Sequence, residues 1–186
     1  PTLYNAFSVL LLGVFCGPVA NGLFDAGTKL VDISQQFLKI ISRTFFPFLS
    51  RKIDKHTLFS KIYMLFTLIV TLGLIFFAPF LIPVFFSEEF SESIKVLRLM
   101  AISGVFLTMS NIYGTNYLII IGRERSLRNL TMYASLLGFV IAIPLIYYGG
   151  YMGAVAIIVF VRMLLGVGSY LLAYNCKKNI CKKNLL

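Results

Sequence analysis

Long apolar runs separated by short polar links are the main pattern of this 186-residue sequence. An α-helix needs about 20 mostly apolar residues to cross the hydrocarbon core of a bilayer. The pattern therefore predicts an all-α, polytopic membrane bundle of six transmembrane helices within residues 1–175, followed by a basic cytoplasmic tail at 176–186. The dipeptide Asn21-Gly22 is a turn signal between the first two spans. The predicted spans are 3–20, 23–47, 62–83, 96–121, 130–148 and 154–174.

The second predicted span differs from the others because it carries charges along its whole length. At about 100° per residue its polar side chains fall within an arc of roughly 80°, and we call this set the polar stripe. Each central charge costs about 2.5–3.5 kcal/mol on insertion scales, whereas each Leu, Ile, Phe or Val contributes only about 0.3–0.6 kcal/mol. The stripe should therefore face protein or a water-filled cavity, where intramembrane charges mark substrate or ion paths. Its members are Asp25, Lys29, Asp32, Gln36, Lys39 and Arg43.

Composition supports a membrane protein, with 59% hydrophobic residues, 13% charged residues and a mean hydropathy of +0.88. The net charge of +10 does not indicate a nucleic-acid partner, because the Lys and Arg residues gather between the apolar spans. The sequence starts at Pro1 without an initiator Met or a signal peptide. We therefore expect it to be part of a longer chain.

The charges of the links predict how the spans are oriented. Links 51–61 and 123–128 and the tail are basic, whereas Glu88, Glu89 and Glu92 make the intervening link acidic. Counting spans places every basic segment on one side, and Lys and Arg favour the cytoplasmic side. We expect basic cytoplasmic loops, and we expect His56, in the first of them, to be a solvated loop residue.

Arg162 is a second intramembrane charge, in the middle of the last span. Two interpretations are open for it: an ion-pair partner of Asp25 or Asp32, or a further cationic contact for a substrate. The sequence contains a single histidine and neither an HExxH nor a GxSxG motif, so it indicates neither an enzyme nor a metal site. No cofactor is expected, apart from proton or sodium coupling through Asp25 and Asp32.

Four segments resemble the C-terminal half of Wzx-type polysaccharide flippases, within the MATE/MOP-like exporter superfamily. The resemblance covers about residues 1–175 and implies one lobe of a twelve-helix flippase, whose two six-helix bundles give alternating access to a central cavity. The missing N-terminal six-helix half would form the other wall of that cavity. The segments are GLFDAGTKLVDI (22–33), FFPFLSRK (45–52), APFLIPVFFSEEFSESIKVLRLMA (78–101) and NIYGTNYLIIIGRER (111–125).

The resemblance and the polar stripe together predict translocation of an undecaprenyl-diphosphate-linked oligosaccharide, such as an O-antigen unit of lipopolysaccharide, across the bacterial inner membrane. Lys29, Lys39, Arg43 and Arg162 would contact the diphosphate, and Gln36 the sugar hydroxyls. One alternative is a cation-coupled small-molecule antiporter. Another is a non-transporting membrane assembly subunit, in which the stripe is a buried salt-bridge network. The excess of cations on the stripe favours an anionic cargo.

Overall fold

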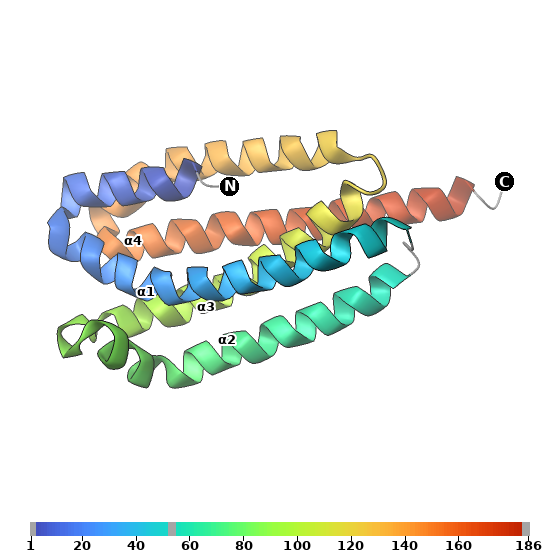
Figure 1. Ribbon diagram of the computed structural model, residues 1–186. Helices are drawn as coiled ribbons and strands as arrows, with labels where there is room; N and C mark the ends of the chain where they lie inside the picture. The colour runs from blue at the N-terminus through green and yellow to red at the C-terminus, as the bar shows by residue number, and fades with distance from the viewer. Residues whose placement is uncertain (1–2, 52–54, 184–186) are drawn as a thin grey trace.

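The computed structural model describes residues 3–51 and 55–183 for the backbone and 6–51 and 55–176 for the side chains, and these residues form helices joined by short turns. It contains four long helices, α1 (Leu3–Arg51), α2 (His56–Phe86), α3 (Ser93–Ser110) and α4 (Glu124–Lys183) (Figure 1). A short 3₁₀ turn, η2 (Glu88–Phe90), follows α2, and a π-helical segment, η3 (Asn111–Leu118), directly continues α3. The predicted all-α fold is confirmed for this part of the chain.

Two of the long helices reverse direction at a glycine (Figure 1). Gly17 in α1 has φ 79° and ψ 179°, and Gly150 in α4 has φ 56° and ψ −139°. Such positive φ values favour glycine, and Pro18 suits the first turn of the helix that follows. We call residues 3–16 and 18–51 the first and second legs of α1, and residues 124–149 and 151–183 the legs of α4. The predicted turn at Asn21-Gly22 is therefore wrong, because both residues are helical.

The turns gather at two ends of the bundle, which differ in charge. At one end Tyr151 donates a hydrogen bond to Glu92 (3.0 Å) and Ser93 donates one to the carbonyl of Leu23 (2.7 Å). Arg51 and the link with Arg123 and Arg125 lie at the other end. We call these the acidic end and the basic end. Which membrane face each occupies remains a prediction, and residues 52–54 and the side chains from 177 onward lie outside the described part.

Helix α3 occupies the middle of the bundle and contacts α1, α2 and α4. Small residues permit this packing: a Cβ added to Gly166 on α4 would lie 2.5 Å from the carbonyl oxygen of Phe106 on α3. Val31 and Leu38 of α1 are buried, as the apolar side of the amphipathic helix requires. By contrast, α2 exposes Leu65, Leu72 and many other apolar side chains on its outer face. All four long helices are long and apolar enough to cross a membrane.

Candidate functional site: a polar stripe and two clefts

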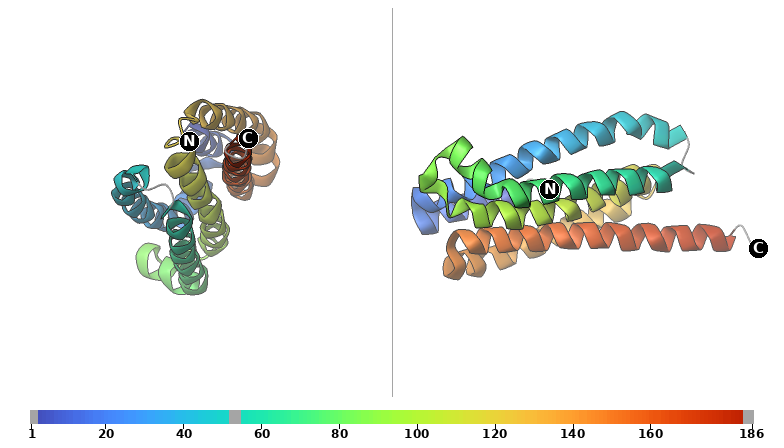
Figure 2. Two further views of the ribbon diagram at one scale, coloured as in Figure 1. Left: turned by 90° about the vertical axis from the view of Figure 1, so that its right-hand side faces the viewer. Right: turned by 90° about the horizontal axis from the view of Figure 1, so that it is seen from below.

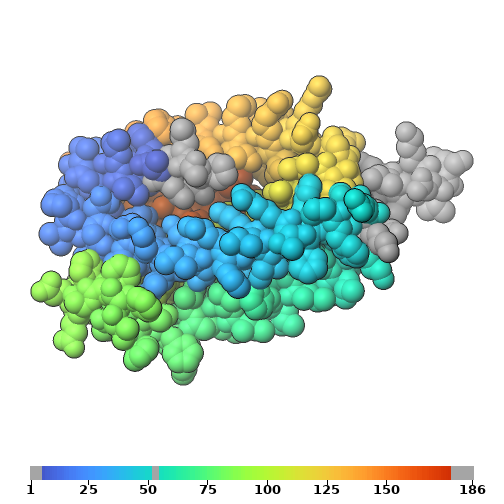
Figure 3. Space-filling view, in the orientation of Figure 1, coloured from blue at the N-terminus to red at the C-terminus, as the bar shows by residue number. Residues whose placement is uncertain are grey.

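The polar stripe runs along the second leg of α1 and is largely uncovered by the rest of the described chain. Most of its side chains are exposed, and Lys39 is half-buried. Figure 3 shows this face hollowed between α1 and the first leg of α4, with the second leg of α4 at the floor of the hollow. The stripe therefore still needs a covering of protein or water if the helix spans a bilayer. The exposed members are Asp25, Lys29, Asp32, Gln36 and Arg43.

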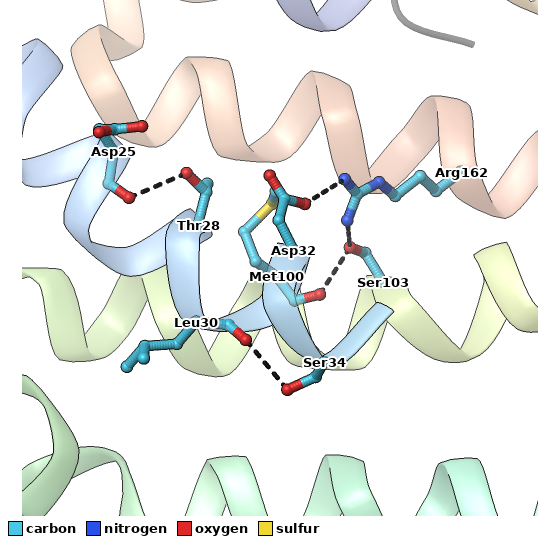
Figure 4. Close-up of polar contacts among 8 residues, drawn as sticks. All are labelled: Asp25, Thr28, Leu30, Asp32, Ser34, Met100, Ser103 and Arg162. Carbon is cyan, nitrogen blue, oxygen red and sulfur yellow. Dashed lines mark hydrogen bonds and ion pairs between the residues drawn. The ribbon is translucent and has the colours of Figure 1, made fainter. Parts of the chain in front are cut away.

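Arg162 reaches the stripe from the second leg of α4 (Figure 4). Its Nη2 atom lies 3.7 Å from Oδ1 of Asp32, and its Nη1 atom donates a hydrogen bond to the Ser103 hydroxyl at 2.9 Å. That hydroxyl in turn donates to the carbonyl of Met100 at 2.7 Å. The Arg162 side chain is only 3% exposed, whereas that of Asp32 is 52% exposed. The structure thus pairs Arg162 with Asp32, one of the two carboxylates predicted for it.

Lys29 has no ion pair within the described residues, although Asp25 precedes it by four positions and Asp32 follows it by three. The side chains of Lys29 and Asp25 are both exposed. Among the described side chains, the ion pair between Asp32 and Arg162 is the one salt bridge of the stripe. This arrangement does not match a buried salt-bridge network formed by the chain itself.

Towards the basic end, the stripe forms one wall of a cleft of about 430 Å³ between α1 and η3. Lys39 and Arg43 contribute two cations. Asn116 donates a hydrogen bond to Ser42 (2.8 Å), and the Nδ2 atom of Asn111 is buried without an acceptor among the described residues. We call this site the cation cleft. Two cations beside an unpaired donor can bind an anion. The full lining is Lys39, Ser42, Arg43, Phe46, Pro47, Asn111, Thr115 and Asn116.

The two asparagines of this cleft were not predicted as site residues. Asn116 connects η3 to α1 through its hydrogen bond to Ser42. What the sequence does not reveal is the π-helical geometry of η3, in which Ile119 N–H bonds to the carbonyl of Gly114, five residues back. Such segments are often found at functional sites. The closest sequence signal is the polar, glycine-containing run NIYGTNY inside an apolar span.

His56 is buried, so its prediction as a solvated loop residue is wrong. It is the first residue of α2, which begins six residues before the predicted span, and its Nε2 atom donates a hydrogen bond to the carbonyl of Ile112 in η3 (3.1 Å). Its ring also lies 5.0 Å from the ring of Tyr117. The sequence around His56 did not indicate that it is buried, because the segment that accepts its hydrogen bond lies more than fifty positions away along the chain.

His56 borders a second, larger cleft of about 840 Å³ between α2, η3 and the second leg of α4. We call it the tyrosine cleft. The rings of Tyr113 and Tyr170 meet edge to face at 5.0 Å, and Tyr174 stacks beside Tyr170 at 6.4 Å. The lining comprises His56, Thr57, Ser60, Lys61, Met64, Leu65, Leu68, Tyr113, Tyr117, Ile121, Tyr170, Ala173 and Tyr174.

Comparisons with known proteins found two similar curated proteins, each named "Putative O-antigen transporter". The protein from Shigella dysenteriae is 29% identical over 170 residues, which is 88% of this chain and 43% of that protein. The protein from Escherichia coli K12 is 23% identical over 156 residues, which is 77% of this chain and 37% of that protein. No family model matches the chain, and no solved structure matches it.

The chain thus spans less than half the length of the curated relatives it matches. Its four long apolar helices, together with this similarity to proteins named as transporters, identify it as a multi-pass membrane protein. This similarity and the resemblance found in the sequence agree in one respect: both point to an O-antigen transporter-like family.

Proposed function

We propose that this chain is part of a flippase that moves an undecaprenyl-diphosphate-linked oligosaccharide, an O-antigen unit or a similar one, across a bacterial inner membrane. The observation that carries the proposal is the cation cleft. It places Lys39 and Arg43 around one cavity at the basic end of an apolar bundle, and the lining of that cavity includes Asn111, whose buried Nδ2 donor is unpaired among the described residues. A diphosphate would supply the acceptor atoms and the negative charge that these groups lack. Proteins named as O-antigen transporters are similar to the chain over most of its length.

In this proposal the chain crosses the membrane six times, because the breaks at Gly17 and Gly150 divide α1 and α4 into two spans each. The basic end would be cytoplasmic by the positive-inside rule. An N-terminal six-helix half would cover the polar stripe and complete a central cavity, as in repeat-built transporters with alternating access. Support comes from the exposure of the stripe and from the fraction of each relative that the chain spans. No chemical catalysis is required of the protein.

The test is a double variant, Lys39→Gln with Arg43→Gln, in the full-length protein. Hydrogen bonds to charged groups contribute about 1.5–3 kcal/mol each. Loss of both cations should therefore reduce surface polysaccharide per molecule of protein severely and cause lipid-linked oligosaccharide to accumulate on the inner leaflet. Lys39→Arg with Arg43→Lys keeps both charges and should retain most activity. Lys55→Gln, an exposed cation outside the cleft, is the matched control. Normal polysaccharide from the double Gln variant would refute the cation cleft as the diphosphate site.

A second candidate function, a cation-coupled antiporter, is favoured by the half-exposed carboxylate of Asp32 beside Arg162. A carboxylate that is partly accessible and next to a buried cation can exchange a proton or sodium ion. In that case Asp25→Asn and Asp32→Asn should reduce transport more than the double Gln variant of Lys39 and Arg43. Comparing both pairs per molecule of protein separates the two functions from effects on folding.

A further inference from the structure

The tyrosine cleft changes character along its length. On α2 the residues nearest the basic end are polar, His56, Thr57, Ser60 and Lys61, and those further along are apolar, Met64, Leu65 and Leu68. Lys61 and Leu68 are seven residues apart, so this gradient extends over about 10 Å at 1.5 Å per residue. The lining of the cleft also includes Ala173 of α4.

The cleft opens onto the outer face of α2 rather than onto the polar stripe. Leu65 and Leu68 line the cleft and are exposed, and they are continuous with other exposed apolar side chains of α2 such as Ile62 and Ile69. Helix α3 and its continuation η3 lie between α2 and α4 (Figure 2). The tyrosine cleft and the cation cleft share no lining residue. A molecule in the surrounding bilayer would reach the tyrosine cleft without passing the stripe.

We propose that the tyrosine cleft is a binding site for a bilayer phospholipid with one negative charge, such as phosphatidylglycerol. The phosphate would lie beside Lys61 and Thr57, and an acyl chain would extend along Leu65 and Leu68. Tyrosine rings suit this boundary, because they combine an apolar body with a polar tip. Basic pockets between membrane helices are known to bind anionic headgroups.

The charges of the two clefts distinguish this lipid from the proposed substrate. Among the side chains that the structure describes, Lys61 is the single Lys or Arg in the lining of the tyrosine cleft, whereas the cation cleft has Lys39 and Arg43 together with a buried unpaired donor. One cation matches the single charge of phosphatidylglycerol and leaves one of the two charges of a lipid-linked diphosphate unneutralised. The inference is independent of the proposed transport function, because lipid binding can be measured without transport.

The experiment uses a tryptophan reporter, since the chain contains no Trp. Tyr170→Trp or Tyr174→Trp places the reporter in the cleft, and Tyr148→Trp places it on an exposed side chain outside the cleft. The full-length protein, with any Trp outside these 186 residues replaced by Phe, is reconstituted into phosphatidylcholine vesicles, and the reporter is quenched with brominated phosphatidylglycerol or brominated phosphatidylcholine. We expect both cleft reporters to favour phosphatidylglycerol by about fivefold, the effect of one Lys near an anionic lipid surface, and the Tyr148 reporter to show no preference.

Lys61→Gln should abolish this preference, whereas Lys95→Gln, an exposed lysine at the acidic end, should leave it unchanged. Equal quenching by both lipids, or a preference that survives Lys61→Gln, would overturn the proposal. A second measurement probes the protein in intact membranes. A photo-crosslinking amino acid at position 170 is activated there, and the mass of the adduct is measured by mass spectrometry. A phosphatidylglycerol adduct supports the site. A polyprenyl-phosphate adduct, a protein adduct or the absence of a lipid adduct refutes it.

Discussion

The ion pair between Asp32 and Arg162 should respond very unequally to removal of its two members. The Arg162 side chain is 3% exposed and that of Asp32 is 52% exposed. Asp32→Leu leaves a guanidinium buried with Ser103 as its remaining partner, because its Nε atom already lacks an acceptor among the described residues. Breaking a buried pair in this way destabilises a protein by about 3–5 kcal/mol.

Arg162→Met is the opposite case. It replaces the buried cation with an apolar side chain and leaves the carboxylate at a half-exposed position where water can reach it. Ser103 keeps its own hydrogen bond to the Met100 carbonyl. A buried ion pair can often be replaced by apolar residues at little or no loss. We therefore expect Arg162→Met to lose at most the hydrogen bond to Ser103, about 1.5–3 kcal/mol for a charged donor.

The double variant Asp32→Leu with Arg162→Met completes the cycle and should be more stable than Asp32→Leu alone, because no charge is then buried without a partner. The assay is thermal unfolding of the purified protein. About 3–5 kcal/mol corresponds to a fall in Tm of roughly 6–20 °C for a chain of this size. If Arg162→Met lowers Tm as much as Asp32→Leu, or if the double variant is no better than Asp32→Leu, the assignment of Arg162 as the buried member would be refuted.

Three further predictions test the fold. In a variant without native cysteines, single cysteines at Ser91 and at Arg125 should react with a membrane-impermeant thiol reagent from opposite faces; labelling from one face would contradict the arrangement of the two ends. Gly166→Ala should destabilise the bundle by about 1–3 kcal/mol because its Cβ would meet the Phe106 backbone, whereas Gly73→Ala, with no atom within 4 Å, should not lower Tm; equal effects would argue against close packing of α3 on α4. Because the polar stripe is exposed, we expect this chain expressed alone to be degraded or to aggregate, and to be rescued by co-expression with six upstream spans. Stable, active protein without those spans would rule out a missing half that covers the stripe.

The sequence was sufficient for the general plan of the fold, because that plan follows from properties that accumulate over many residues. Runs of apolar residues predicted the long helices, and the spacing of Asp25 to Arg43 predicted one polar side on α1. The buried positions of Val31 and Leu38 follow from the same periodicity. Such patterns survive local errors because no single residue decides them.

Features that depend on one residue or on a distant partner could not be predicted. Gly17-Pro18 and Asn21-Gly22 are both local turn signals, only four positions apart, and the sequence did not show which one the chain uses. The burial of His56 requires a carbonyl that η3 supplies from the other side of the bundle. The choice of Asp32 over Asp25 as the partner of Arg162 depends on how far α4 lies along α1. Each of these features depends on how the helices are positioned against one another in the folded chain.

The π-helical segment η3 is a shared wall between two cavities. Its neighbouring residues Asn116 and Tyr117 line different clefts, the first beside Arg43 and the second beside His56. A ligand that shifts this wall from one side therefore changes the shape of the cavity on the other side. By thermodynamic reciprocity, each occupant must then alter the affinity of the other by the same factor. Titrations of the two clefts would have to be carried out jointly, and a substitution in η3 counts as a change to both.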